Sequence, residues 1–155
     1  MAAYGRRYAV TGQRSVSTAA PQTIIALIGV TTVRPFVYDL LIGSSATPAD
    51  IALLWEMQRN TNAGSGATAG VLTALDGGDP AALCGASTNY TTTDPTFTAN
   101  AIVFYLALNQ RASHRWIADP QGPVICPATA AAGVGLWITH ASSTPLVNAI
   151  IHFGE

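Results

Sequence analysis

Three histidines, two closely spaced aspartates and one glycine-rich stretch are the groups in this chain with the most obvious potential for chemistry. His114, His140 and His152 fall on three separate predicted strands, and a barrel could bring their imidazoles together as a metal site. No His-x-His pair and no neighbouring glutamate accompanies them. We therefore interpret them as ordinary core or surface histidines and predict no metal.

The other candidate motifs also lack the residues that their chemistry needs. Asp76 and Asp79 flank two glycines, whereas a calcium loop needs more oxygen ligands at tighter alternation, so turn formation explains them. The stretch Gly64–Gly70 lacks the Gly-Lys-Ser/Thr ending of a phosphate loop, and no Gly-x-Ser-x-Gly motif occurs. The eight acidic residues are scattered rather than paired. The sequence predicts no catalytic residue and no cofactor, so the protein is not expected to be an enzyme.

Arginine and aromatic side chains carry a different signal, because these residue types supply much of the binding energy at protein interfaces. They gather near the start of the chain and around a predicted hairpin turn that follows Asn109. The candidate interface residues are Arg6, Arg7, Tyr8, Trp55, Arg111, Arg115 and Trp116. The alternative is that the tryptophans, Trp137 included, belong to the core and that the turn arginines are simply solvated.

The scarcity of charge sets the broader expectation. All seven basic residues are arginine, eight residues are acidic, and charged residues make up 10% of the chain against 49% hydrophobic. A folded monomer would expose roughly 7,400 Å², which leaves about one charge per 500 Å². Soluble surfaces usually carry far more charge. This composition predicts a surface that is covered by other copies or by a partner, and the net charge of −1 predicts no binding to nucleic acid.

The two cysteines and the apolar segments limit the cellular context. Cys84 and Cys126 are 42 positions apart with no CxxC pattern, so two buried thiols are expected and a single bridge is the alternative. No leader is visible at Met1–Val10, and the longest apolar run, Ala101–Leu108, is too short for a membrane span. We expect the chain to fold in a cytoplasm-like compartment and to make no membrane contact.

Short runs rich in Thr, Val, Ile and aromatic residues, separated by Gly, Pro, Asn, Asp and Ser, indicate an all-β sandwich or barrel. In the last run, Val147, Ala149, Ile151 and Phe153 fall on one face, while Ile150 is an apolar residue on the other face. The predicted strands are Tyr4–Val10, Thr23–Val30, Arg34–Ile42, Ile51–Arg59, Ala101–Leu108, Ser113–Ala118, Gly135–Ala141 and Val147–Phe153.

Three segments leave alternatives open. Pro48–Arg59 fits a helix capped by Thr47, although we favour a turn and then a strand with Leu53, Trp55 and Met57 on one face. Region 60–98 is expected to be a long irregular loop region. Residues 1–15 are a candidate extended arm that reaches beyond the domain. The whole chain, 1–155, is expected to form one antiparallel domain.

Several segments resemble small capsid decoration (cement) proteins of tailed phages and related environmental sequences. The similar segments are Ser45–Asp50, Leu53–Trp55, Gln58–Arg59, Leu75–Pro80, Asn109–Trp116, Pro127–Ala130 and Ile151–Phe153. The resemblance implies an antiparallel β-sandwich of jelly-roll type that sits as a homotrimer on the outside of a capsid. It implies a virion location, with the major capsid protein or another virion protein as partner, and no catalytic residues.

Three functional hypotheses follow. The first is a decoration protein that oligomerises and stabilises the capsid shell. The second is a self-assembling fibre, tube or tail subunit, in which a swapping N-terminal arm serves head-to-tail growth. The third is a carbohydrate-binding module that uses loop residues such as Asn89 and Tyr90, and it is supported mainly by analogy of fold.

Overall fold

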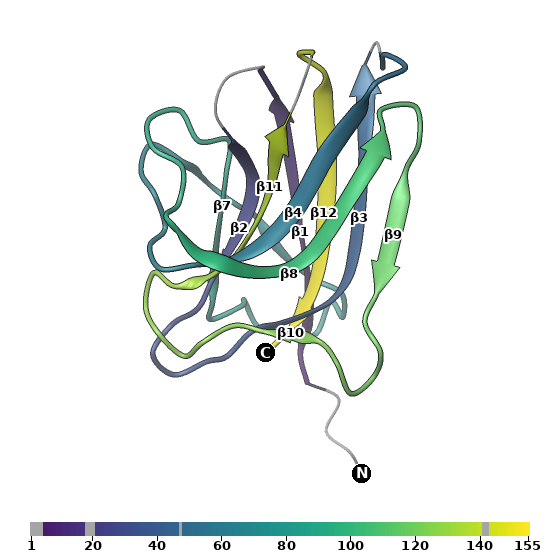
Figure 1. The fold of residues 1–155 in the computed structure, drawn as a ribbon. Helices are drawn as coiled ribbons and strands as arrows, with labels where there is room; N and C mark the ends of the chain where they lie inside the picture. The colour runs from purple at the N-terminus through teal and green to yellow at the C-terminus, as the bar shows by residue number, and fades with distance from the viewer. Residues whose placement is uncertain (1–4, 18–20, 47, 141–142) are drawn as a thin grey trace.

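The computed structural model describes residues 5–17, 21–46, 48–140 and 143–155. These residues form two antiparallel β-sheets that pack face to face, and no helix occurs among them (Figure 1). The predicted all-β sandwich is therefore confirmed.

Each sheet has six strands, and from β1 to β4 successive strands alternate between the two sheets. Sheet A has the order β10-β3-β12-β1-β6. Strand β9 also pairs with β3, farther along that strand than β10 does. Its strands are β1 (Arg7–Ser15), β3 (Phe36–Ala46), β6 (Leu72–Ala74), β9 (His114–Ile117), β10 (Val124–Ile125) and β12 (Leu146–Gly154). Sheet B has the order β5-β7-β2-β11-β4-β8. Its strands are β2 (Gln22–Ile28), β4 (Ala52–Asn60), β5 (Thr68–Ala69), β7 (Gly85–Thr88), β8 (Phe97–Asn109) and β11 (Gly133–His140).

All eight strands expected from the sequence are present, and their ends differ by a few residues. The helix considered for Pro48–Arg59 is wrong, because β4 occupies 52–60 and buries Leu53, Trp55 and Met57 on one face. A period of two buries these three side chains together between the sheets, and a helical period of 3.6 would have separated them.

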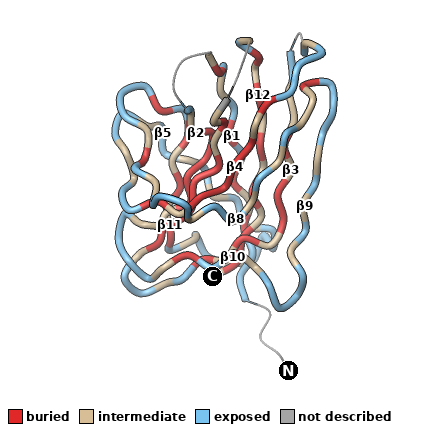
Figure 2. Tube along the Cα trace, in the orientation of Figure 1, coloured by how far each residue is buried: buried red, intermediate tan, exposed pale blue. Residues whose placement is uncertain are grey.

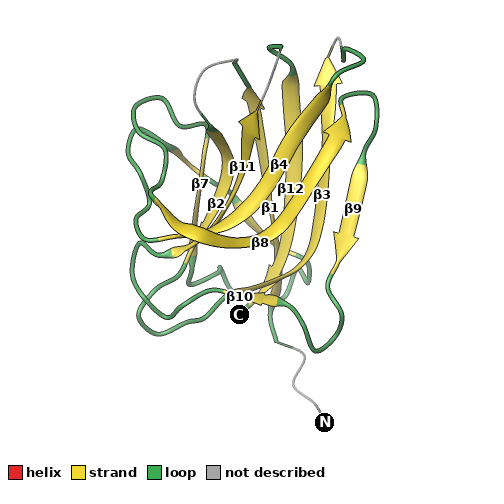
Figure 3. Cartoon of the chain, in the orientation of Figure 1, coloured by secondary structure: helices red, strands yellow, loops and turns green. Residues whose placement is uncertain are grey.

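Region 60–98 is only partly irregular (Figure 3). It contains the three short strands β5, β6 and β7, and β8 begins within it at Phe97. Strands β5 and β6 are too short to show a periodic pattern, and β7 contains only small residues, which is why the sequence did not reveal them. Asp94 anchors the rest of the region, since its carboxylate accepts hydrogen bonds from the Arg14 guanidinium at 2.8 Å and from the Thr23 backbone N–H at 2.6 Å.

The expectation of an extended arm at residues 1–15 is wrong for the part that the structure describes as strand. Residues 7–15 form β1, which lies inside sheet A between β12 and β6. The strand pairs with β12 over its whole length, and Tyr8 and Val10 are completely buried. Burial of these side chains holds the segment against the domain. Residues 1–4 lie outside the described part of the chain.

The core lies between the two sheets, where the buried segments of the tube run side by side (Figure 2). Tyr8 stacks on Phe153 with ring centroids 5.5 Å apart, and Trp55 is the largest fully buried side chain. The sheets approach most closely at Gly12, where an added Cβ would lie 2.4 Å from Ile25 Cγ1. A glycine is therefore required at this crossing of β1 and β2.

The two lateral sides of the sandwich end differently. On one side the edge strands are β5 and β6, which are two and three residues long. On the other side sheet B ends in β8, which is 13 residues long and pairs only with β4 among the described strands. Phe104 of β8 reaches the side chains of His114 and Trp116 on β9, and these rings close the gap between the sheets.

Candidate interaction face

The outer face of sheet A is the most distinctive surface of the molecule, because its central strands expose apolar residues that no further layer covers. The register places Arg115, Leu41, Ile150 and Thr11 in one row across β9, β3, β12 and β1. Leu41 and Ile150 are half-buried, although two-layer sandwiches usually turn polar side chains outward. The apolar Ile150 that stood out in the sequence therefore lies on an uncovered face.

A buried carboxylate lies in the neighbouring row of this face. The Asp39 side chain is only 5% exposed, and its two oxygens accept hydrogen bonds from Arg115 Nε at 3.0 Å and Arg115 Nη2 at 2.7 Å. His152 Nδ1 lies 3.0 Å from Asp39 Oδ2. The hydrogen bonds from Arg115 and, more weakly, His152 hold the pKa of the Asp39 carboxyl below its usual 3.8, although burial opposes this shift. The carboxylate therefore stays ionised and keeps Arg115 in place.

Aromatic stacking extends this network toward the start of β1. The Tyr38 ring stacks on the His152 imidazole at a centroid distance of 6.2 Å, and the guanidinium of Arg7 lies 5.3 Å from the centre of the Tyr38 ring. A guanidinium over an aromatic face is attracted by the ring quadrupole. Arg7, Tyr38, His152, Asp39 and Arg115 thus form one continuous string of contacts, which we call the Asp39 network.

Two hollows flank the network. One has a volume of about 300 Å³ and is lined by Arg7, Phe36, Tyr38, Ile117, Ala118, Asp119, Pro120 and Pro123. The other is a shallow apolar depression of about 120 Å³ over the strands β3 and β12, between Leu41 and Ile150. Ile117, at the rim of the first hollow, is 59% exposed. Apolar, aromatic and arginine side chains around shallow hollows are typical of protein interfaces.

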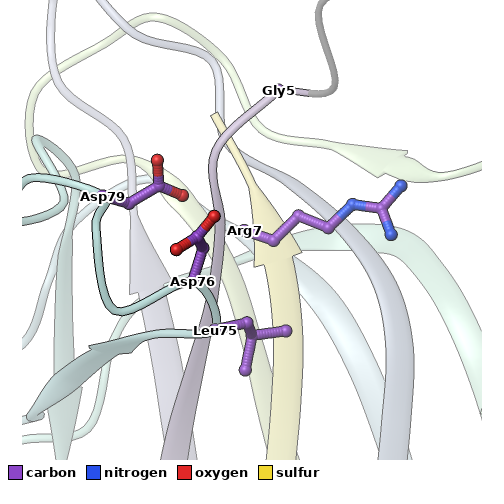
Figure 4. A pocket seen from close by; sticks show the side chains of 5 residues that line it. All are labelled: Gly5, Arg7, Leu75, Asp76 and Asp79. Atoms are coloured by element: carbon purple, nitrogen blue, oxygen red, sulfur yellow. The ribbon is translucent and has the colours of Figure 1, made fainter.

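A third pocket, of about 370 Å³, lies near the start of β1 and holds the two aspartates considered in the sequence. It is lined by Gly5, Arg7, Leu75, Asp76 and Asp79, and the Arg7 guanidinium points away from both carboxylates (Figure 4). Asp76 Oδ1 accepts the Gly78 N–H at 2.9 Å, and the Asp76 carbonyl accepts the Asp79 N–H at 3.0 Å. These bonds close a turn, as expected for such residues. In the described residues, no three His, Cys, Asp or Glu side chains are grouped to hold a metal ion.

The structure divides the candidate interface residues into two groups. Tyr8 and Trp55 are buried in the core, at 0% and 1% exposure, so their assignment to an interface is wrong. Large aromatic residues on the inner face of a sandwich fill the space between the sheets. Trp116 is half-buried against the core.

The arginines of the list stay at the surface. Arg7 and Arg115 both join the Asp39 network. Arg6 is exposed beside the last residue of the chain, since its carbonyl accepts the Glu155 N–H. Arg111 is exposed in the turn between β8 and β9.

Sequence reasoning missed the centre of the face, which consists of Tyr38, Asp39 and His152. The signal was present in Asp39, the only charged residue within the apolar run 36–42. A carboxylate on a strand of this kind needs buried partners, but the partners come from β9 and β12, more than 70 positions away. Only the fold could identify them.

The two thiols are free and buried, so the expectation of buried thiols is confirmed. Burial raises the pKa of Cys126 to about 12, and burial next to the Glu155 carboxylate raises the pKa of Cys84 further.

Comparison with known proteins found no matching family model, no matching curated protein and no matching solved structure. Within its described residues, the chain has no helix long and apolar enough to cross a membrane.

Proposed function

We propose that this chain is a structural virion protein, a capsid decoration (cement) protein that associates with copies of itself and binds the outside of a capsid shell. The observation that carries the proposal is the outer face of sheet A. It combines half-buried Leu41 and Ile150 with an exposed Ile117 and an arginine network on a rigid sheet. Such a face gains free energy when it is covered, at about 25 cal/mol per Å² of apolar surface.

The order of the long strands supports a jelly roll as the finer description of the fold. Strands β9-β3-β12-β1 lie opposite β8-β4-β11-β2 in that order, and the chain moves from one sheet to the other at each step from β1 to β4. Two interleaved Greek keys produce this order, and the architecture is common in viral capsid domains. The analogy concerns the fold alone and adds only modest weight to the function.

The mechanism that we propose is mechanical. The capsid partner, the major capsid protein or another virion protein, would cover the outer face of sheet A. Each bound subunit would bridge neighbouring shell proteins, so that opening the shell requires several contacts to break together. Because charged residues make up only 10% of the chain, covering its surface carries little cost of charge desolvation.

Co-sedimentation with shells assembled from the capsid protein encoded with this chain tests the proposal. We expect the wild-type protein to sediment with the shells and Ile150→Glu to lose at least about tenfold in affinity, since a carboxylate would be desolvated at the centre of the face. Gln121→Glu adds the same charge in an exposed turn and should bind as the wild type does. Absence of shell binding, or equal binding by Ile150→Glu, would contradict the proposal.

A fibre, tube or tail subunit is the alternative, and electron microscopy of the purified protein separates the two, because filaments in the absence of any shell favour it. Its N-terminal swapping arm is less accessible than expected, since residues 7–15 are paired within sheet A. For the carbohydrate-binding alternative, Tyr90 is 3% exposed and so is not free to stack on a sugar. A glycan array would test that role directly.

A further inference from the structure

Strand β8 is an edge of unusual length. It contains 13 residues, whereas most strands have five or six, and its only backbone pairing among the described residues is with β4. The free side of such a strand presents a row of unpaired N–H and C=O groups, which is a template for pairing with another chain.

Strand β8 has few of the features that usually prevent an edge strand from pairing with another chain. The opposite side of the sandwich is protected by the shortness of β5 and β6. By contrast, no charged residue and no proline occurs from Thr96 to Gln110. The edge carries Ile102, Val103 and Tyr105, which are 42%, 36% and 61% exposed. Two irregularities interrupt the pairing with β4, a bulge at Val103 and a larger register shift between Phe97 and Ile102, and from Phe104 to Asn109 the pairing is continuous.

The composition of the edge identifies a second copy of the chain as its occupant. A strand that pairs with itself about a twofold axis places like residues close together, and any charge on it would meet the same charge. An uncharged edge is free of this repulsion. A second copy is also present wherever the protein is made, and the unpaired N–H and C=O groups of one β8 can form hydrogen bonds with those of the other.

We propose that β8 pairs antiparallel with β8 of a second copy, about a twofold axis near Leu106, so that sheet B continues through a dimer. Tyr105 then lies opposite Ala107 of the second copy, which sets a bulky side chain against a small one. Phe104 lies opposite Leu108 of the second copy, on the inner side. Both residues of the first pair are exposed in the monomer, and both of the second are half-buried.

This inference deepens the proposed function, on which it rests for the role of self-association, because it names the surface through which copies meet. It differs from the trimer that the resemblance implies. A twofold contact closes after two copies, whereas a trimer needs two different patches to meet.

Analytical ultracentrifugation of the full-length chain at micromolar concentration tests the pairing. We expect a species of twice the monomer mass of 16.0 kDa. Ala107→Glu and Ala107→Lys should each raise the dimer dissociation constant at least about tenfold, because the two copies of residue 107 are diagonal neighbours on the same face of the seam and their like charges would repel. An equal mixture of the two variants should restore a dimer of one copy of each.

The controls separate this effect from misfolding and from the proposed function. Thr11→Glu, exposed on β1, should leave the dimer unchanged, and the thermal midpoints of both Ala107 variants should match the wild type. A wild-type monomer or trimer, a dimer insensitive to Ala107→Glu, or no restoration in the mixture overturns the inference. Shell binding by a monomer would overturn the β8 pairing while leaving the shell-binding role of the proposed function standing. A dimer without affinity for shells would support the β8 pairing and contradict the shell-binding role.

Discussion

Asp39 carries a negative charge on a strand whose other side chains from Phe36 to Ile42 are uncharged, and it does so because Arg115 and His152 donate to it. Both partners lie on neighbouring strands of sheet A, so the carboxylate links β3 to β9 and β12. An ionised group that is buried with its hydrogen bonds satisfied contributes to stability, whereas the same group left without partners would be costly.

Asp39→Asn should lower the free energy of unfolding at pH 7 by about 1–3 kcal/mol, since charge-assisted hydrogen bonds to Arg115 are lost. The pKa of Asp39 is lower in the folded chain than the ordinary 3.8, so its stabilisation is present above about pH 4 and is lost as the pH falls through the folded value. Urea unfolding at pH 7 and pH 3 measures both effects, and the difference in the free energy of unfolding between the two proteins should be smaller at pH 3 than at pH 7.

Asp119→Asn is the matched control for this experiment. Asp119 is exposed and its carboxylate accepts only the Gln121 N–H among the described hydrogen bonds, and an asparagine oxygen can accept the same bond. Its stability should stay within about 0.5 kcal/mol of the wild type. A difference between Asp39→Asn and wild type that persists unchanged at pH 3 would show that the loss is not due to the charge.

Cys84 and Cys126 should react with a thiol reagent only when the chain unfolds. Their pKa values are raised by burial, to about 12 for Cys126, so neither forms the reactive thiolate near pH 8. Because the folded pKa values exceed the ordinary 9.0, the two thiols favour the folded state below pH 9 and lose this contribution as the pH rises further. Thiol titration in buffer and in urea tests this, with Thr11→Cys as an exposed control, and rapid labelling of native Cys126 would contradict it.

At the scale of the elements, the two sheets are held at a fixed separation by their inner side chains and by the glycines where strands cross. Gly12 on β1 lies against Ile24 and Ile25 of β2, with no room for a methyl group. Sandwich interiors are closely packed, so an extra carbon at this crossing forces the backbones apart.

Gly12→Ala should therefore lower the free energy of unfolding by about 1–3 kcal/mol. Gly77→Ala is the matched control, because an added Cβ there meets no atom within 4 Å and the position is an exposed turn. Urea denaturation of both variants measures the difference. Equal stability of the two would show that the sheets are not in close contact at Gly12.

At the scale of the whole molecule, an accessible surface of 7711 Å² belongs to a chain with only seven arginines and eight acidic residues. Asp39 and Glu56 are buried, so the surface carries less than about one charge per 500 Å². Several of these charges are already paired inside the monomer, such as Arg14 with Asp94 and Arg115 with Asp39. Few ionic groups are left to direct association, so apolar burial and backbone pairing must drive it.

Self-association should therefore be nearly independent of sodium chloride between low and physiological ionic strength, and stronger in sulfate, which favours burial of apolar surface. Sedimentation of the wild-type protein over a salt series measures this. A steep fall in association with added sodium chloride would contradict it, because it would show that ion pairs hold the copies together.

The strands of the sandwich could be predicted from the sequence because each long strand carries its own period-two pattern. Strand β4 shows this, since the large apolar residues Leu53, Trp55 and Met57 fall at every second position and are buried together. The short strands β5, β6 and β10 could not be predicted, because two or three residues hold no period. Strand β7 could not be predicted because its sequence, Gly-Ala-Ser-Thr, has no large apolar side chain.

The sequence by itself determined the all-β class, the seven long strands together with β9, and the shortage of charge, because these depend on residue type and local spacing. Only the tertiary structure decided which aromatic residues lie in the core and which residues form hydrogen bonds with the Asp39 carboxylate. It also decided that β8 is an edge strand and that β1 is not. These depend on strand order, which joins residues such as Asp39 and His152 across 113 positions. Pairing over such distances follows from how whole sheets bury their apolar faces, and no local pattern encodes it.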